Sequence, residues 1–126
     1  MLRFIKFGIL LILVFLSCNK PKPKVEILDY SITVITHPLP YYSGERPYSH
    51  APYCSGRVTN TGDKTAYKVK VHVVFSNATK TFEKYISEVN LEPAEVSSFS
   101  VKGDSVITYN SNPPYFSVNS IWVTHE

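Results

Sequence analysis

The sequence contains few residues whose types and spacing suit chemistry at a site. Its four histidines do not follow the H-E-x-x-H pattern or another paired-ligand spacing, and G-x-S-x-G and glycine-rich phosphate loops are absent. His50 and Cys54 stand four residues apart, but only His37 is near enough in sequence to act as a third ligand. We therefore expect no metal, no cofactor and no catalytic residue, and we predict that the chain is not an enzyme.

Cys18 is the residue with the most definite predicted chemistry. Arg3 and Lys6 precede an apolar run, Phe7–Leu16, that has the length of a signal-peptide core and is too short to span a bilayer. Ser17 and Cys18 follow it, and a small residue directly before a cysteine resembles the lipobox of bacterial lipoproteins. The resemblance implies that Cys18 becomes the first mature residue and carries lipid, including palmitate. The alternative is an ordinary signal peptide or an uncleaved anchor.

This reading divides the chain into three parts: a lipoprotein signal peptide at 1–17, a lipidated cysteine with a Lys/Pro tether at 18–24, and one folded domain at 25–126. Alternating Lys and Pro favour extended polyproline II over a helix, so the tether is short and holds the domain near the membrane. Its lysines either contact anionic head groups or are simply solvated.

The net positive charge of the chain comes from the parts outside the predicted domain. The formal net charge is +3, and it becomes +1 without Arg3 and Lys6 and −2 from Val25 onward, once the three tether lysines are also left out. Nucleic-acid binding requires basic residues clustered on the fold, so we expect no nucleic-acid partner. With Cys18 lipidated, Cys54 has no partner for a disulfide, and the domain must be stabilised by burial.

Period-2 alternation of apolar side chains predicts an all-β domain. From Tyr67 to Phe75 every second residue is apolar, and Arg57–Thr59 is expected to pair with this strand as a hairpin through the turn at Asn60–Asp63. About seven strands separated by turns predict an immunoglobulin-like, two-sheet antiparallel sandwich. The other expected strands are Glu26–Ile35, Thr81–Val89 at an edge, Val96–Val101 with Phe99 and Val101 inward, Ser105–Tyr109, and Tyr115–His125 with Phe116, Val118 and Trp122 in the core.

The segment Thr36–Tyr53 shows no periodicity and is expected to form a long loop. It holds four prolines and four tyrosines, and such a combination offers rigid aromatic faces on a pre-ordered backbone. We identify it as a possible recognition loop; the alternative is that its tyrosines close one end of the sandwich. The candidate contact residues are Tyr41, Tyr42, Arg46, Tyr48 and Tyr53.

Three segments together resemble the FxLYD domain family. Its members show a G-x-V-x-N segment, a long strand and an L-x-P-G-E turn before an inward Phe, which correspond here to Gly56–Asn60, Tyr67–Phe75 and Leu91–Glu95 before Phe99, with Ala94 in place of the turn glycine. The namesake motif falls on Val73–Asn77, where Ser76 and Asn77 replace Tyr and Asp. Val58–Asp63 is similar to the bacterial cell-adhesion-related domain. Both resemblances imply an immunoglobulin-like domain of exported bacterial lipoproteins and no catalytic motif.

The expected function is therefore that of a lipid-anchored module of the bacterial cell envelope, facing the periplasm or the cell surface. The membrane is the expected partner of Cys18, and an envelope protein or polymer is the expected partner of the domain. A surface-exposed, adhesin-like module is the alternative, and a hydrolytic or metal-dependent enzyme is the least favoured.

Overall fold

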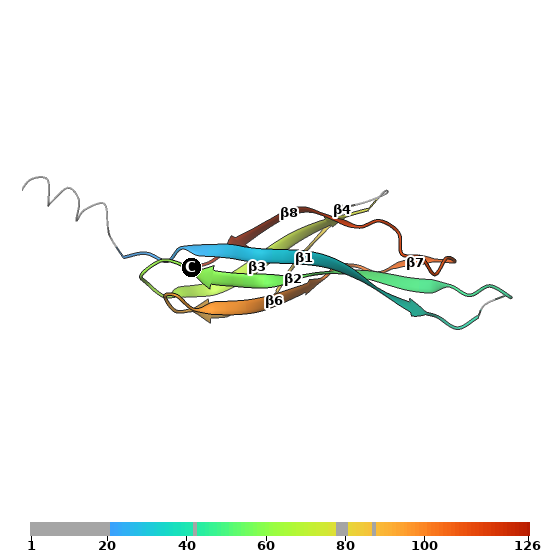
Figure 1. Cartoon of the computed structure of the whole chain (residues 1–126), viewed down its shortest axis with the longest axis horizontal. Helices are drawn as coiled ribbons and strands as arrows, with labels where there is room; N and C mark the ends of the chain where they lie inside the picture. The colour runs from blue at the N-terminus through green and yellow to red at the C-terminus, as the bar shows by residue number, and fades with distance from the viewer. Residues whose placement is uncertain (1–20, 42, 78–80, 87) are drawn as a thin grey trace, which may run out of the picture.

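The computed structural model describes residues 21–41, 43–77, 81–86 and 88–126. Within these residues the chain forms eight strands and no helix, and the strands make two antiparallel sheets that pack face to face (Figure 1). The predicted all-β, immunoglobulin-like sandwich is confirmed. Sheet 1 contains β1 (Val25–Pro38), β2 (Tyr48–Asn60), β6 (Val96–Lys102) and β7 (Val106–Thr108); sheet 2 contains β3 (Ala66–Ser76), β4 (Thr81–Tyr85), β5 (Val89–Leu91) and β8 (Ser117–Thr124).

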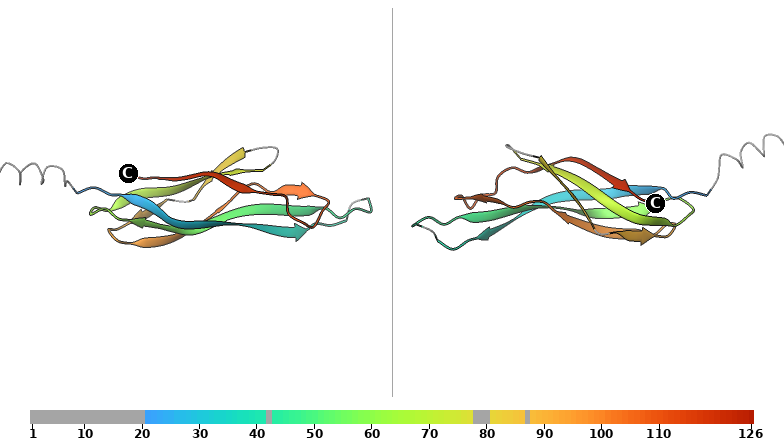
Figure 2. Two further views of the ribbon diagram at one scale, coloured as in Figure 1. Left: turned by 45° about the horizontal axis from the view of Figure 1, so that its top comes forward. Right: turned by 180° about the vertical axis from the view of Figure 1, so that it is seen from behind.

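Each sheet is built around one long strand. In sheet 1, β2 pairs with β1 on one side and with β6 and β7 on the other. In sheet 2, β3 pairs with β8 on one side and with β4 and β5 on the other. Figure 2 shows the strands of the two sheets crossing obliquely, as expected for twisted sheets in a sandwich.

The predicted hairpin between Arg57–Thr59 and Tyr67–Phe75 is wrong. Residues 57–59 lie in β2 of sheet 1, whereas β3 belongs to sheet 2, so the chain crosses between sheets after Asn60. Both strands have one apolar face, and these faces are buried by packing against each other across the sandwich instead of pairing side by side.

The core confirms the predicted phase of β3 for most of its length. Val71, Val73 and Phe75 are fully buried, as is Val69, whereas Tyr67 is half exposed. A register shift lies between Ala66 and Val69, and Lys68 within it has a positive φ of 51°, so Ala66 takes the buried position expected for Tyr67. The rest of the core cluster is Cys54, Val58, Ala66, Leu91, Phe99 and Val101.

The prediction that Trp122 lies in the core is also wrong. Phe116 is buried as expected, but two positions of β8 oppose one of β3 between the Phe75–Val118 and Val74–Ser120 pairs. This bulge shifts the alternation by one residue. Ile121 and Val123 therefore pack on the core, and Trp122 points outward and stacks on the ring of His72.

The expected edge strand Thr81–Val89 is present only as far as Tyr85, as β4, and a separate short strand, β5, begins at Val89; both lie at the edge beside β3. The inward positions of Phe99 and Val101 in β6 are confirmed, and β7 lies within the expected strand Ser105–Tyr109.

The long loop predicted at Thr36–Tyr53 is much shorter in the structure. β1 continues to Pro38 and β2 begins at Tyr48, its partner in the register, so residues 39–47 connect the two strands. Proline is tolerated within β2 because the flanking strand is interrupted there: β6 ends opposite Tyr53 and β7 begins opposite His50. Across this gap the backbone N–H of Gly103 donates to the carbonyl of Pro52 at 2.9 Å. No strand residue there requires a hydrogen bond from a backbone N–H at position 52, which proline lacks.

The tether is not a free spacer where the structure describes it. Thr61 N donates to Lys24 O at 2.8 Å, and Lys24 N donates to Asn60 Oδ1 at 3.2 Å. Asp63 N donates to Lys22 O at 3.2 Å, and a Cβ on Gly62 would collide with that carbonyl. The segment Lys22–Lys24 is therefore bound to the turn after β2, whereas Cys18 lies outside the described residues.

Candidate functional site

The molecule is elongated, and its two ends differ (Figure 1). One end, here called the base, contains Lys22–Lys24, the turn at Asn60–Asp63 and the C-terminus, which is held by reciprocal backbone hydrogen bonds between Tyr67 and Glu126. The other end, here called the distal end, contains the described residues of the β1–β2 hairpin between 39 and 48, without residue 42, together with Ile107–Tyr115. The candidate recognition residues belong to the distal end.

The hairpin tip is closed by backbone geometry that presents side chains outward. Leu39 N donates to Pro47 O at 2.9 Å, and both Ser43 and Gly44 have positive φ, at 52° and 81°. Positive φ at two successive residues is a backbone conformation that tight hairpin turns use, and it matches the twist of the flanking strands. The Arg46 guanidinium lies over the ring of Tyr41, 4.3 Å from its centroid, in a cation–π contact on an exposed tyrosine.

A buried histidine joins three strands beneath this tip. His50 in β2 contacts Thr36 Oγ1 of β1 through Nδ1 at 2.8 Å and Thr108 Oγ1 of β7 through Nε2 at 2.7 Å. The Thr108 hydroxyl donates to the carbonyl of Asn110, so it accepts from Nε2–H, and Nδ1 accepts from Thr36. The ring of Tyr48 is stacked with the ring of His50, with their centroids 6.5 Å apart.

A second aromatic segment lies beside the hairpin, and the sequence analysis missed it. β7 pairs Thr108 with Tyr48, so the chain after Thr108 emerges at the distal end. Ile107, Tyr109 and Tyr115 expose 62%, 66% and 79% of their surfaces. Asn112 N donates to Asn110 Oδ1 at 2.9 Å in an Asx turn, which orders this segment. Its composition, Tyr and Pro among Asn and Ser, is the sequence signal that could have indicated it.

The structure brings together only part of the predicted recognition set. Tyr41 and Arg46 are in contact at the tip, and Tyr48 lies half-buried just behind them. Tyr53 is five residues farther along β2, beside Lys102 in the register, and does not join the distal end. Tyr42 lies outside the described residues.

The distal end exposes aromatic side chains and carries no net charge over its described residues. Glu45 and Arg46 are the only acidic or basic side chains that the described parts of these two segments carry, and their charges cancel. Rigid tyrosines among Pro, Ser and Asn are the composition of protein-binding loops.

The described residues contain no group of three or more His, Cys, Asp and Glu side chains placed to hold a metal ion. His50 and Cys54 both face inward, but four residues along a strand separate their positions by about 13 Å. Cys54 is a free, buried cysteine, and burial raises the pKa of its thiol, which keeps it protonated. Within the described part of the chain no helix is long and apolar enough to cross a membrane.

No protein-family model and no curated protein match this chain. Among solved structures, a structural-genomics target designated SoR45 is 11% identical at a TM-score of 0.35, covering 75% of this chain and 84% of that one. A protein from Bordetella pertussis with the provisional name ApaA is 15% identical at a TM-score of 0.34, covering 75% of this chain and 91% of that one. Both TM-scores are below 0.5.

Proposed function

We propose that this protein is a non-catalytic, lipid-anchored module of the bacterial cell envelope that presents its distal end to a protein or polymer partner. The proposal has two parts: the attachment of Cys18 to a membrane and the recognition of a partner by the exposed aromatic residues Tyr41, Tyr109 and Tyr115. Each part has its own support and its own test.

The observation that carries the proposal is the opposition of the two ends. The segment Lys22–Lys24, which follows the predicted lipidation site, is hydrogen-bonded to the base, and the exposed tyrosines Tyr41, Tyr109 and Tyr115 belong to the opposite end of the long axis (Figure 1). A membrane anchor at Cys18 would thus hold the base at the bilayer and direct the distal end away from it. This polarity suits a module that contacts something beyond the membrane surface.

The anchoring part is tested by replacing Cys18. Cys18→Ala should accumulate as an unprocessed precursor or release the domain from membranes, because multiple acyl chains supply the affinity for stable anchoring. The measurement is detergent partitioning and the N-terminal mass of the mature protein. Normal processing and membrane partitioning of this variant would overturn the proposal.

The recognition part is tested by removing the distal rings. The triple variant Tyr41→Ala, Tyr109→Ala and Tyr115→Ala should lose at least about tenfold in captured partner, because exposed tyrosines are typical contributors to binding energy. Cross-linking and affinity capture from solubilised envelopes provide the measurement. Tyr30→Ala with Tyr67→Ala removes two half-exposed tyrosines away from the distal end and serves as the control. Equal capture by both variants would place the recognition surface elsewhere.

Membership in the FxLYD family is proposed on the same grounds as the resemblance, with one added support. Ala94 stands where that family has glycine, and its φ of 66° is a left-handed conformation that favours glycine. Pro93 precedes it and Glu95 N donates to Glu92 O at 3.0 Å, which makes a type II turn. The backbone thus keeps the geometry that the family residue would supply.

A surface-exposed, adhesin-like role is the second candidate, since an outward-facing distal end would suit recognition of another cell. Protease treatment of intact cells separates the two: digestion of the domain before lysis supports surface display, and protection until lysis supports a periplasmic location.

A further inference from the structure

One sheet edge of this molecule lacks the features that normally block strand pairing. β6 is the outer strand of sheet 1 over seven residues, pairs with β2 without a register shift and contains no proline. Its only charged residue is Lys102, at the end of the strand. An edge of this kind leaves backbone N–H and C=O groups available to a further strand.

The other edges that the structure describes are protected. β1 and β8 each have a register shift, and they contact each other along the opposite side of the sandwich. β4 carries Glu83 and Lys84, and β5 and β7 are three residues long each. Bulges, charges and short length are the usual means of blocking edge pairing, so the exposed edge of β6 stands apart from these.

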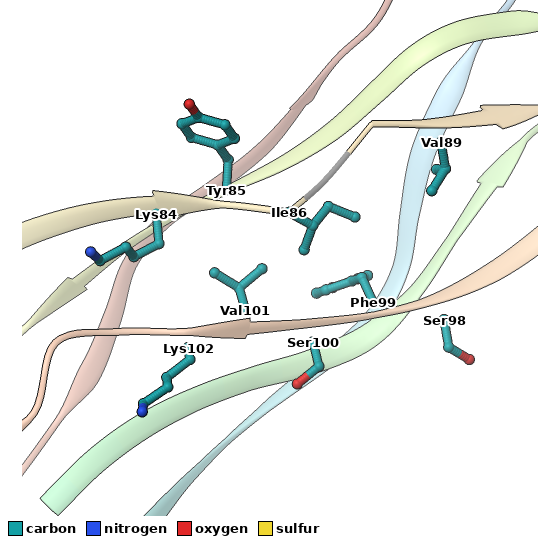
Figure 3. A pocket seen from close by; sticks show the side chains of 9 residues that line it. All are labelled: Lys84, Tyr85, Ile86, Val89, Ser98, Phe99, Ser100, Val101 and Lys102. Atoms are coloured by element: carbon teal, nitrogen blue, oxygen red, sulfur yellow. The ribbon is translucent and has the colours of Figure 1, made fainter.

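An open groove of about 440 Å³ lies beside this edge, between the two sheets. Figure 3 shows Phe99 and Val101 of β6 directed toward Ile86 and Val89 across the opening, while Ser98, Ser100 and Lys102 point the other way. We call this opening the β6 slot; its lining is Lys84–Ile86, Val89 and Ser98–Lys102. An added strand would place alternate side chains in the slot and the others beside Ser98, Ser100 and Lys102.

The charges indicate which strand would fit. The slot is lined by two lysines and by no aspartate or glutamate. Lys84 is engaged by Asp104 at 2.8 Å, whereas Lys102 lies exposed on the outer face of sheet 1, next to where an added strand would run. An apolar side chain pointing into the slot and an acidic one beside Lys102 would complement both surfaces.

We propose that β6 accepts an extended segment of a partner protein as an additional strand of sheet 1, with alternating apolar residues in the β6 slot and an acidic residue beside Lys102. Backbone hydrogen bonds to β6 supply affinity, and the slot and Lys102 supply selectivity, as in other cases of strand addition. This surface is separate from the distal end, so it does not depend on the proposed function.

The test uses two capped peptides of about nine residues, enough to cover β6. Valine and threonine alternate in both peptides. One peptide has glutamate at both ends and the other has lysine at both ends, so that a charged residue lies beside Lys102 whether the peptide pairs parallel or antiparallel to β6. Amide NMR spectra of the full chain in detergent are recorded with each peptide, up to about 2 mM, which detects weak binding. We expect shifts and exchange protection at alternate amides of Val96–Lys102 with the glutamate peptide.

Charge reversal then tests the assigned selectivity. Lys102→Glu should lower the affinity for the glutamate peptide by about threefold and raise the affinity for the lysine peptide, since one exposed charge pair has an effect of this order. Lys64→Glu, an exposed lysine at the base with the same charge change, should leave both affinities unchanged. The proposal would be overturned if neither peptide shifted the amides of β6, or if the shifts were confined to the distal end. It would also be overturned if each peptide bound the wild type and Lys102→Glu with the same affinity.

Discussion

At the scale of single residues, Asn60 connects several parts of the molecule. It is fully buried; its Nδ2 donates to the carbonyls of Lys64 and Leu91, at 2.8 Å and 3.0 Å, and its Oδ1 accepts from Lys24 and Gly62. Its backbone N–H and C=O pair with Glu95 and Ala94. A buried polar side chain is tolerated when its hydrogen-bonding groups are satisfied, and here they join the tether, both sheets and the turn before β6.

Ala94 has a left-handed backbone conformation, with φ at 66°, that alanine adopts only at a cost. Ala94→Gly should raise the free energy of unfolding by about 0.5–1 kcal/mol, because glycine removes the cost of the left-handed conformation, partly offset by greater freedom in the unfolded chain. Urea denaturation measures the change. Ala51→Gly, at a buried position in β2 with ordinary φ, should instead lower stability. A loss of stability in Ala94→Gly would contradict the assigned turn.

Cys54 gives a prediction about alkaline pH. Burial raises the pKa of its thiol above the usual 9.0, so the folded state holds this proton more tightly than the unfolded state. The contribution of Cys54 to stability is therefore complete below pH 9.0 and is lost as the pH rises through the folded-state pKa. Between pH 8 and pH 10 the urea midpoint of the wild type should fall. The midpoint of Cys54→Val, which keeps the side chain apolar, should fall less. Equal losses in the two proteins would exclude this cause.

At the scale of elements, the sequence predicted strand type and inward face better than strand pairing. Alternation located the buried residues Val71, Val73 and Phe75 because the period of a strand depends only on local geometry. It failed at Tyr67 and Trp122, since a single bulge reverses the face of every following residue and leaves no local signal. It also failed for the hairpin tip, where prolines at 38 and 52 suggested a loop although both lie in paired strands.

The candidate site was predictable only in part for a related reason. Tyr41 and Arg46 were found because they stand together in a segment of unusual composition. Tyr109 and Tyr115 were missed because only the pairing of β7 with β2 brings them to the same end, and such long-range pairing cannot be read from local pattern.

His50 should control the order of the distal end. His50→Leu keeps a side chain of similar size but loses the contacts to Thr36 and Thr108, so we expect faster amide exchange in Tyr48–Ala51 and β7 and a cost of about 1–3 kcal/mol. Hydrogen exchange followed by mass spectrometry locates the change. His72→Leu, on the outer face of sheet 2, should leave exchange at the distal end unchanged. Uniform loss of protection across both sheets would show that His50 acts on the whole fold.

At the scale of the whole molecule, the bound tether sets the orientation of the domain relative to its proposed anchor. Three residues separate Cys18 from Lys22, which is the first of the described residues with a hydrogen bond to the base. β1 alone, at 14 residues, extends about 43 Å from the base toward the distal end. An anchored protein would therefore stand with its distal end at a defined height above the bilayer.

Gly62 tests this orientation. Gly62→Val places side-chain atoms against the carbonyl of Lys22 and should displace the tether, with the core of both sheets retained. Energy transfer between a labelled bilayer and the distal end should then show a broader distribution of distances with a shorter mean. Gly44→Asn is the control, because no atom lies within 4 Å of a Cβ there and asparagine tolerates positive φ. An unchanged distribution in Gly62→Val would contradict the role of the bound tether.

The course of β1 also has a mechanical consequence. The strand leads directly from the tether at the base to the hairpin at the distal end, so a single stretch of covalent backbone joins the two. If a partner pulled on the hairpin while lipid held Cys18, the tension would run along β1, which is already extended, and no hydrogen bond of either sheet would lie in series with the load. A force of this kind would reach the lipid anchor before it could unfold the sandwich.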